Sequence, residues 1–280
     1  MTVPHDPLFD SAWLKWAQAI LHSQALERDI TEGASNGDTD PVRAFRAEYH
    51  PKRHGFAVIV EDVAPIPVRW RLLLGDIANN YRASLDHFAW ALVSRGSARL
   101  TTQQERAVYF PIYEDRLKYN AAFGRLLPGV RRADAARVRW CQPYRHGPSV
   151  RSRHPLVILA SINTGDKHRT VQPLWAFPSR VDIEVTRMRD CVLRGTEHWR
   201  RQATPLEAGT EVAFMFGRKR GSNPELEVQL HIASTPTIGN RISVREWHVR
   251  TGILIFSLLR QFSSQPASIH EVGAELAALP

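Results

Sequence analysis

Five polar residues on one predicted helix form two clusters, on opposite shoulders of its apolar face, that could do chemistry. At 100° per residue, Asp76, Asn80 and His87 fall within about 40° of one another on the helix surface. Arg82 and Asp86 have the i,i+4 spacing of a helical ion pair. A carboxylate, an amide and an imidazole on one flank indicate a ligand-binding or proton-transfer set. The alternative is that Arg82 and Asp86 form a solvated ion pair and that His87 is a structural histidine at the edge of the core.

A second dense polar segment begins at Asn163. Its ionisable residues are consecutive: Asp166, Lys167, His168 and Arg169. Such a segment could bind an anion or polarise a substrate oxygen. Alternatively, Asp166 caps a following helix that includes Leu174. We expect the two segments to share one pocket, with the side chain of Asp86 or His87 within about 8 Å of residues 166–169.

Hydrophobic periodicity predicts the elements that would position these groups, and it favours an α+β fold. We expect a helical core made of a long N-terminal helix, a long central helix, the helix bearing Asp166–Arg169 and a C-terminal helix, with a small antiparallel sheet. The expected helices cover 7–32, 68–95, 116–126, 133–141, 156–162 and 244–262. The expected strands cover 44–50, 56–63, 180–186, 211–216 and 225–233. We divide the chain into a helical domain at 1–178, with an inserted β-hairpin, and strands plus a helix at 179–280, which could belong to the same domain.

Charge and composition indicate the class of partner. The 280 residues include 37 Lys and Arg against 28 Asp and Glu, a net charge of +9. The excess is mostly arginine, whose planar guanidinium pairs well with phosphate, so RNA or another anionic ligand is a plausible partner. A basic patch at 217–221 in a predicted hairpin could also contact phosphate. Two distant cysteines, and the lack of a leader or of a long apolar run, favour a cytoplasmic protein that does not enter a membrane.

The polar segments also form a recognisable pattern. Residues 75–87, 110–112 and 163–169 resemble a set of bacterial proteins, without an assigned activity, that share GDxxxNxRSxLDH, a later FPI and NxxDKHR. This sequence has Ala83 where that pattern has serine. The resemblance covers roughly residues 13–175 and implies relatives but no reaction.

Residues 82–87 also resemble the Rx4–6H motif of HEPN-type ribonucleases, which are helical dimers that cleave RNA without metal. The resemblance implies that Arg82 stabilises the phosphorane, that His87 is the acid and base, and that Asp86 is an orienting polar neighbour, in a protein that forms a homodimer. The polar residues that would then bind substrate are Asp76, Asn80, Asn163, Asp166, Lys167, His168 and Arg169. On an ideal helix, however, Arg82 and His87 point about 140° apart. We therefore predict a HEPN-like, metal-independent ribonuclease or RNA-binding protein of the toxin or defence type.

Two alternatives stay open. A metal-dependent helical-bundle enzyme that acts on a small molecule would use His22, His87 and His168, on three predicted helices, to hold a divalent metal. A non-catalytic interaction module would use the polar cluster as a buried structural network.

Overall fold

The computed structural model describes residues 3–35, 42–96, 99–167, 174–197, 205–239, 242–267 and 269. Side chains are described throughout these ranges except at 33–35, 165–167, 179, 196–197 and 233. The chain divides into two compact units. The helical unit comprises Met1–Glu27, Arg69–Gln172 and Arg245–Pro280, and the β unit comprises Arg28–Val68 and Pro173–Val244.

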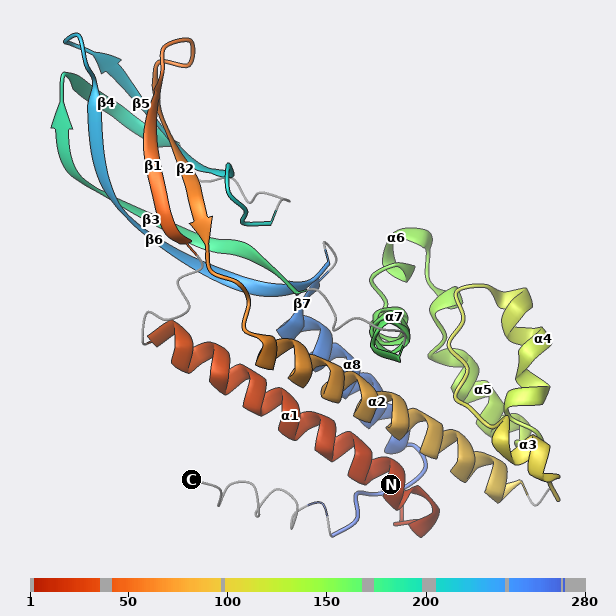
Figure 1. The fold of residues 1–280 in the computed structure, drawn as a ribbon. Coiled ribbons are helices and arrows are strands. Elements are labelled where there is room, and N and C mark those ends of the chain that lie inside the picture. The colour runs from red at the N-terminus through yellow and green to blue at the C-terminus, as the bar shows by residue number, and fades with distance from the viewer. Residues whose placement is uncertain are drawn as a thin grey trace. The chain divides into compact units, whose positions relative to one another are not determined.

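Three long helices pack side by side in the helical unit (Figure 1). They are α1 (Asp10–Ser35), α2 (Val68–Arg95) and α8 (Val244–Leu259). Side chains join them by hydrogen bonds to backbone carbonyls: the Ser84 hydroxyl donates to Ala12, and the Trp16 indole donates to Gly252. At Gly252 a Cβ atom would lie 2.7 Å from the Tyr81 hydroxyl oxygen, so this glycine allows α8 to approach α2 closely.

The periodicity of α2 explains its central place. Apolar residues recur every three or four positions, as one continuous buried face requires. Its buried large side chains are Trp70, Leu74, Ile77, Tyr81, Leu85, Phe88 and Leu92. The predicted helix at 68–95 is confirmed.

Shorter helices complete the helical unit. They are η1 (Pro7–Phe9), α3 (Thr102–Arg106), α4 (Arg116–Leu126), α5 (Arg132–Trp140), η2 (Pro143–Arg145), α6 (Pro148–Arg151) and α7 (Pro155–Lys167). Side-chain caps fix three of the starts. Asp6 accepts from the Leu8 N–H at η1, Thr101 forms a capping box with Gln104 at α3, and Asp115 accepts from the Lys118 N–H at α4. No helix among the residues described has both the length and the apolar character needed to cross a membrane.

Two antiparallel sheets form the β unit. Their strands are β1 (Val42–His50), β2 (Gly55–Val63), β3 (Leu174–Arg189), β4 (Cys191–Glu197), β5 (Glu211–Lys219), β6 (Glu225–Ile238) and β7 (Ile242–Ser243). The first sheet has the order β1-β2-β5-β4, and the second has the order β3-β6-β7. Apolar side chains from both sheets, among them Val58, Met215 and Ile232, pack into one core.

The α+β class with antiparallel sheet is confirmed, but the division of the chain differs from the expected one. The hairpin at 42–63 belongs with the strands at 174–243, and α8 belongs with the helical unit. Leu174 begins β3, so the alternative in which Asp166 caps a helix that includes Leu174 is wrong. Asp166 and Lys167 instead end α7, so the helix expected at 156–162 extends five residues further, and His168 and Arg169 lie outside the described residues.

Candidate functional site

Arg82 and Asp86 of α2 form the ion pair that their spacing predicts. The Arg82 Nε and Nη2 atoms donate to the two Asp86 carboxylate oxygens at 3.0 and 2.8 Å. The same Nη2 donates to the Phe110 carbonyl at 3.0 Å, and the Phe110 N–H donates to Asp86 at 2.9 Å. The pair therefore holds both backbone polar groups of Phe110, the first residue of the FPI sequence. The Arg82–Asp86 contact is charge-assisted and bidentate, and the single bond to the Phe110 carbonyl completes a fixed structural link between α2 and the segment after α3.

His87 lies next in sequence, in a different environment. Its ring is half-buried, and among the described residues it makes no hydrogen bond. Burial lowers the pKa of His87, the Lys15 ammonium of α1 lowers it further, and Asp86 opposes both. The imidazole is therefore neutral at pH 7 and could accept a proton. Arg82 is held at Phe110, so Arg82 and His87 do not act on each other directly.

Asp76 and Asn80 differ in exposure. The Asp76 side chain is exposed, whereas Asn80 is buried. The Asn80 amide donates to the Asp76 backbone carbonyl at 2.9 Å, one turn earlier in α2. This bond uses the Asn80 side chain within its own helix.

The expected contact between the α2 side chains and the side chains of residues 166–169 involves residues that the structure does not describe. Asn163 is half-buried on α7, and the backbone of Asp166 and Lys167 is helical. The side chains of all four residues from Asp166 to Arg169 lie outside the described residues. The predicted approach within about 8 Å stays a prediction.

The alternative metal site depends partly on the same segment. His22 Nε2 lies 3.1 Å from the Gln18 amide nitrogen, and His168 lies outside the described residues. Within the described ranges, no three His, Cys, Asp or Glu side chains cluster as metal ligands would. The cysteines in this part of the chain, Cys141 and Cys191, are both unpaired thiols and buried.

The structure also brings together three turns of the β unit at one end, which we call the basic end. They are the β1–β2 turn at 51–54, the β3–β4 turn at Asp190 and the β5–β6 turn at 220–224. Strand register places them together: Gly55 pairs with Phe216, and Cys191 pairs with Lys219. The Asp190 carbonyl accepts from the Arg220 N–H at 2.8 Å, which joins two of the turns directly.

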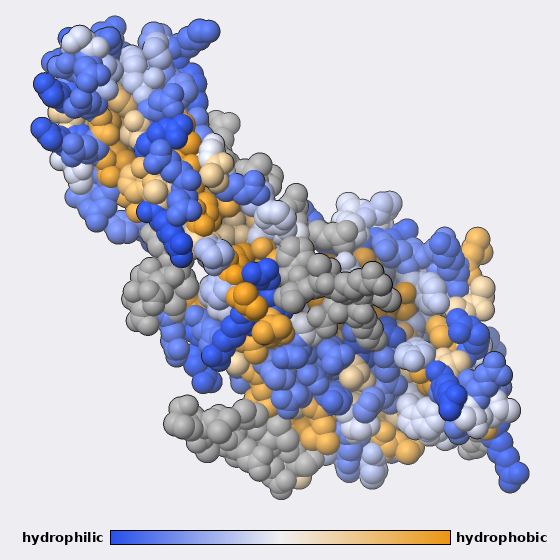
Figure 2. Space-filling model, viewed as in Figure 1, coloured by the Kyte–Doolittle hydropathy of each residue, from blue (hydrophilic) through white to orange (hydrophobic). Residues whose placement is uncertain are grey.

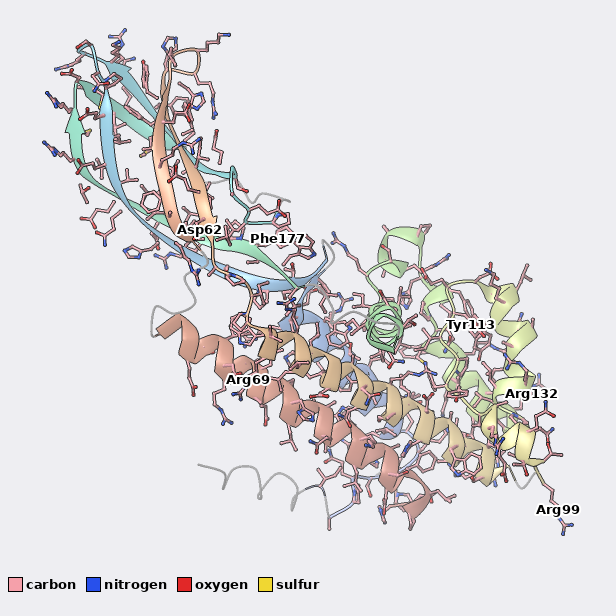
Figure 3. All side chains as sticks on the ribbon, viewed as in Figure 1. Asp62, Arg69, Arg99, Tyr113, Arg132 and Phe177 are labelled. Carbon is pink, nitrogen blue, oxygen red and sulfur yellow. The ribbon has the colours of Figure 1, made fainter. Side chains whose placement is uncertain are left out.

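Cations outnumber acids at the basic end. Within 51–54, 187–194 and 217–227 the sequence has eight Lys and Arg but three acids. Glu227 pairs with Arg187 and Glu225 with Arg189, all on exposed side chains. Five further cations form no ion pair with any described residue: Lys52, Arg194, Arg218, Lys219 and Arg220. Figure 3 shows nitrogen-tipped side chains projecting outward at this end, and in the view of Figure 2 its surface is mainly hydrophilic.

Two adjacent aromatic rings lie between two arginines on one face of the four-stranded sheet, beside the basic end. Phe214, Phe216 and Arg218 lie on one face of β5, because side chains two residues apart share a face. The Arg53 guanidinium stacks 3.7 Å from the Phe214 ring centre and pairs with Glu211. We call Arg53, Phe214, Phe216 and Arg218 the aromatic–arginine stripe.

The Phe216 ring is the uncovered part of this stripe. Phe216 is 39% exposed, whereas Phe214 is 3% exposed. Its directly paired residues on the neighbouring strands are both glycines, Gly55 and Gly195. The Phe214 ring fills the space over Gly55 and meets the Phe216 ring at 5.2 Å between ring centres, whereas a Cβ at Gly195 would meet no atom within 4 Å. Phe216 therefore offers an open aromatic surface on the Gly195 side.

Sequence reasoning identified the basic patch at 217–221 but missed the stripe. The period-two pattern of residues 212–218 contains the signal, because Phe214, Phe216 and Arg218 share one parity. The flanking glycines and Arg53 come from strands that are distant in sequence, so no local pattern places them there.

No known protein family, curated protein or solved structure matches the chain.

Proposed function

We propose that the protein binds single-stranded RNA, and that the basic end with the aromatic–arginine stripe is the binding surface. The observation that carries the proposal is the exposed Phe216 ring, set between two glycines and followed on the same face by Arg218. Cationic side chains beside exposed aromatic rings on a sheet surface are the usual means of binding single strands.

Electrostatics supply the sequence-independent part of this binding. The unpaired cations at 218–220 lie on an exposed hairpin whose backbone is tied to Asp190. Their side chains can neutralise successive phosphates without breaking an ion pair to a described residue. Each phosphate contact releases condensed counterions, so affinity must fall as salt rises.

Stacking supplies the preference for single strands. An unpaired base can lie flat on the Phe216 ring, whereas the bases of a duplex are stacked on each other. Arg53 is less available, because it is stacked on Phe214 and bonded to Glu211 at 2.6 and 2.9 Å. Because its guanidinium is already held, we expect Arg53 to contribute to the positive potential near the RNA without being a main contact.

Fluorescence anisotropy with a labelled single-stranded RNA of mixed sequence tests the proposal. Replacing Phe216 with Ala removes one stacking contact of about 1–3 kcal/mol, so we expect at least a fivefold loss of affinity. Phe216→Tyr keeps the ring and should bind like the wild type. A triple replacement of Arg218, Lys219 and Arg220 by Gln should also lower the slope of log affinity against log salt by about 2.

A matched control changes the same number of charges in the helical unit. Arg99, Arg132 and Arg153 are exposed, and Figure 3 shows the Arg99 side chain extended away from the helices. Their triple replacement by Gln should leave the affinity within about twofold of the wild type. Equal losses in the two triple variants, or a wild type that does not bind the RNA, would refute the proposal.

Cleavage of the bound RNA stays a prediction of the HEPN resemblance. It requires Arg82 to act on a phosphate while it holds Asp86 and Phe110. Incubating the wild type with the same RNA in EDTA tests it: cleavage that disappears in His87→Ala supports the ribonuclease, and intact RNA counts against it. Binding at the basic end does not depend on this result.

A further inference from the structure

The helical unit contains a cavity of about 500 Å³ that the RNA-binding proposal does not use. Its walls come from the end of α5, the segment through α6 to the start of α7, and one face of α8. Pockets of this volume are typical of sites for small organic molecules.

Most of the lining is apolar. Leu254 and Leu258 of α8 line the cavity. Trp140, at the end of α5, and Val150, in α6, line it from elements that are distant in sequence. Trp140 is 69% exposed and Ile253 is 60% exposed, although both are large apolar side chains that are normally covered. An apolar ligand body would cover these side chains.

The charged part of the lining is cationic. Arg145 and Arg250 both contribute, and no acidic residue is among the described residues that line the cavity. Arg250 donates to Glu246 at 3.1 Å, one turn away on α8, so its charge is partly neutralised. Arg145 forms no ion pair with a described residue. The cavity therefore presents little more than one net positive charge.

A buried histidine adds a neutral donor. His154 is 5% exposed, and its ring lies 5.0 Å from the His146 ring, centre to centre, at a tilt of 39°. Its Nδ1 accepts the Leu156 N–H at 3.2 Å, so the ring proton lies on Nε2. Burial, with His146 and Arg250, lowers the pKa of His154 to about 4, so this ring is uncharged at pH 7.

We propose that this cavity binds a small monocarboxylate with an apolar body, whose carboxylate lies at Arg145 and whose body lies against Leu254 and Leu258. A single carboxylate matches the charge of the lining, whereas a phosphate dianion would bring a second charge with no partner. An uncharged analogue would leave the Arg145 guanidinium without its anion.

Isothermal titration calorimetry with decanoate, at concentrations below micelle formation, tests this site. We expect saturable binding to the full chain, with at least tenfold weaker binding of decanol and of decyl phosphate. Arg145→Gln should weaken decanoate binding at least tenfold, because a charge-assisted hydrogen bond is lost. Arg153→Gln makes the same charge change on the same segment outside the cavity and should bind like the wild type.

A second variant tests the cavity itself. Ser257 is exposed and lines the cavity, so Ser257→Trp fills it without removing a buried group, and it should abolish binding. The proposal is overturned if decanoate gives no saturable heat with the folded wild type, if decanol or decyl phosphate binds as tightly as decanoate, or if Ser257→Trp binds unchanged. Because these residues are distinct from the basic end, the outcome is independent of RNA binding.

Discussion

Replacing Asp86 with Ala should destabilise the helical unit strongly. The Asp86 carboxylate accepts two hydrogen bonds from Arg82 and one from the Phe110 N–H, all between 2.8 and 3.0 Å. The side chains of Arg82 and Asp86 are 16% and 23% exposed. Removing one partner of a fully buried pair costs about 3–5 kcal/mol, and partial exposure places this pair at the low end, at about 3 kcal/mol.

Urea unfolding followed by far-ultraviolet circular dichroism measures this loss. Glu246→Ala is the matched control, since Glu246 and Arg250 have the same spacing in the same unit but are 57% and 44% exposed. We expect the control to cost about 0.5 kcal/mol. Arg82→Met combined with Asp86→Ala should cost less than the sum of the two single changes, because each single change leaves the other group unpaired. Additive effects, or an Asp86→Ala loss no larger than that of the control, would refute a structural role for the pair.

Two further changes in the helical unit have defined outcomes. Between about pH 7.5 and about pH 5, the wild type should lose about 2 kcal/mol of stability relative to His154→Asn, measured by urea unfolding at each pH. Unfolded His154 takes up a proton near its ordinary pKa of 6.5, whereas folded His154, with a pKa of about 4, does not. A difference that does not change with pH would contradict this reasoning. Gly252→Ala should lower stability by about 1–3 kcal/mol in the same assay, because the new methyl group meets the buried Tyr81 hydroxyl. Gly124→Ala on α4 meets no atom within 4 Å and should raise stability by about 0.5–1 kcal/mol, so a loss there as large as that at Gly252 would argue against steric crowding.

Local pattern was sufficient for most helices and hairpin strands. The α2 boundaries follow from its long apolar stripe and from Gly96, whose N–H bonds to the Val93 carbonyl as the helix ends. The β1 and β2 strands follow from apolar and aromatic residues, interspersed with charged ones in β1, on either side of a short polar turn. These features depend on residues close together in sequence.

The pairing of strands that are distant in sequence could not be predicted from local sequence patterns. The β2 strand pairs with β5 more than a hundred residues later, at Gly55, where a Cβ would meet Phe214 and the Met215 carbonyl. This pairing assigns the hairpin to the β unit, which the predicted division at residue 178 did not do. The β4 strand was missed because a register shift between Leu193 and Gly195 interrupts its alternation.

In the candidate sites too, contacts between residues close in sequence were predicted, and contacts between distant residues were not. The i,i+4 spacing predicted the Arg82–Asp86 pair, but nothing in the sequence predicted that Phe110 would be its third member. The basic turn at 217–221 was visible as a charge run. The exposed ring of Phe216 was not, because its exposure depends on Gly195 of β4, a strand that the sequence did not place beside it.

Photo-crosslinking with single-stranded RNA that contains 4-thiouridine, followed by peptide mapping, tests the central claim most directly. Binding at the basic end predicts crosslinks at Phe216 and in the peptides that cover 51–54 and 217–224, and their loss in Phe216→Ala. Crosslinks confined to the arginine-rich segment at 131–153 of the helical unit would contradict the account.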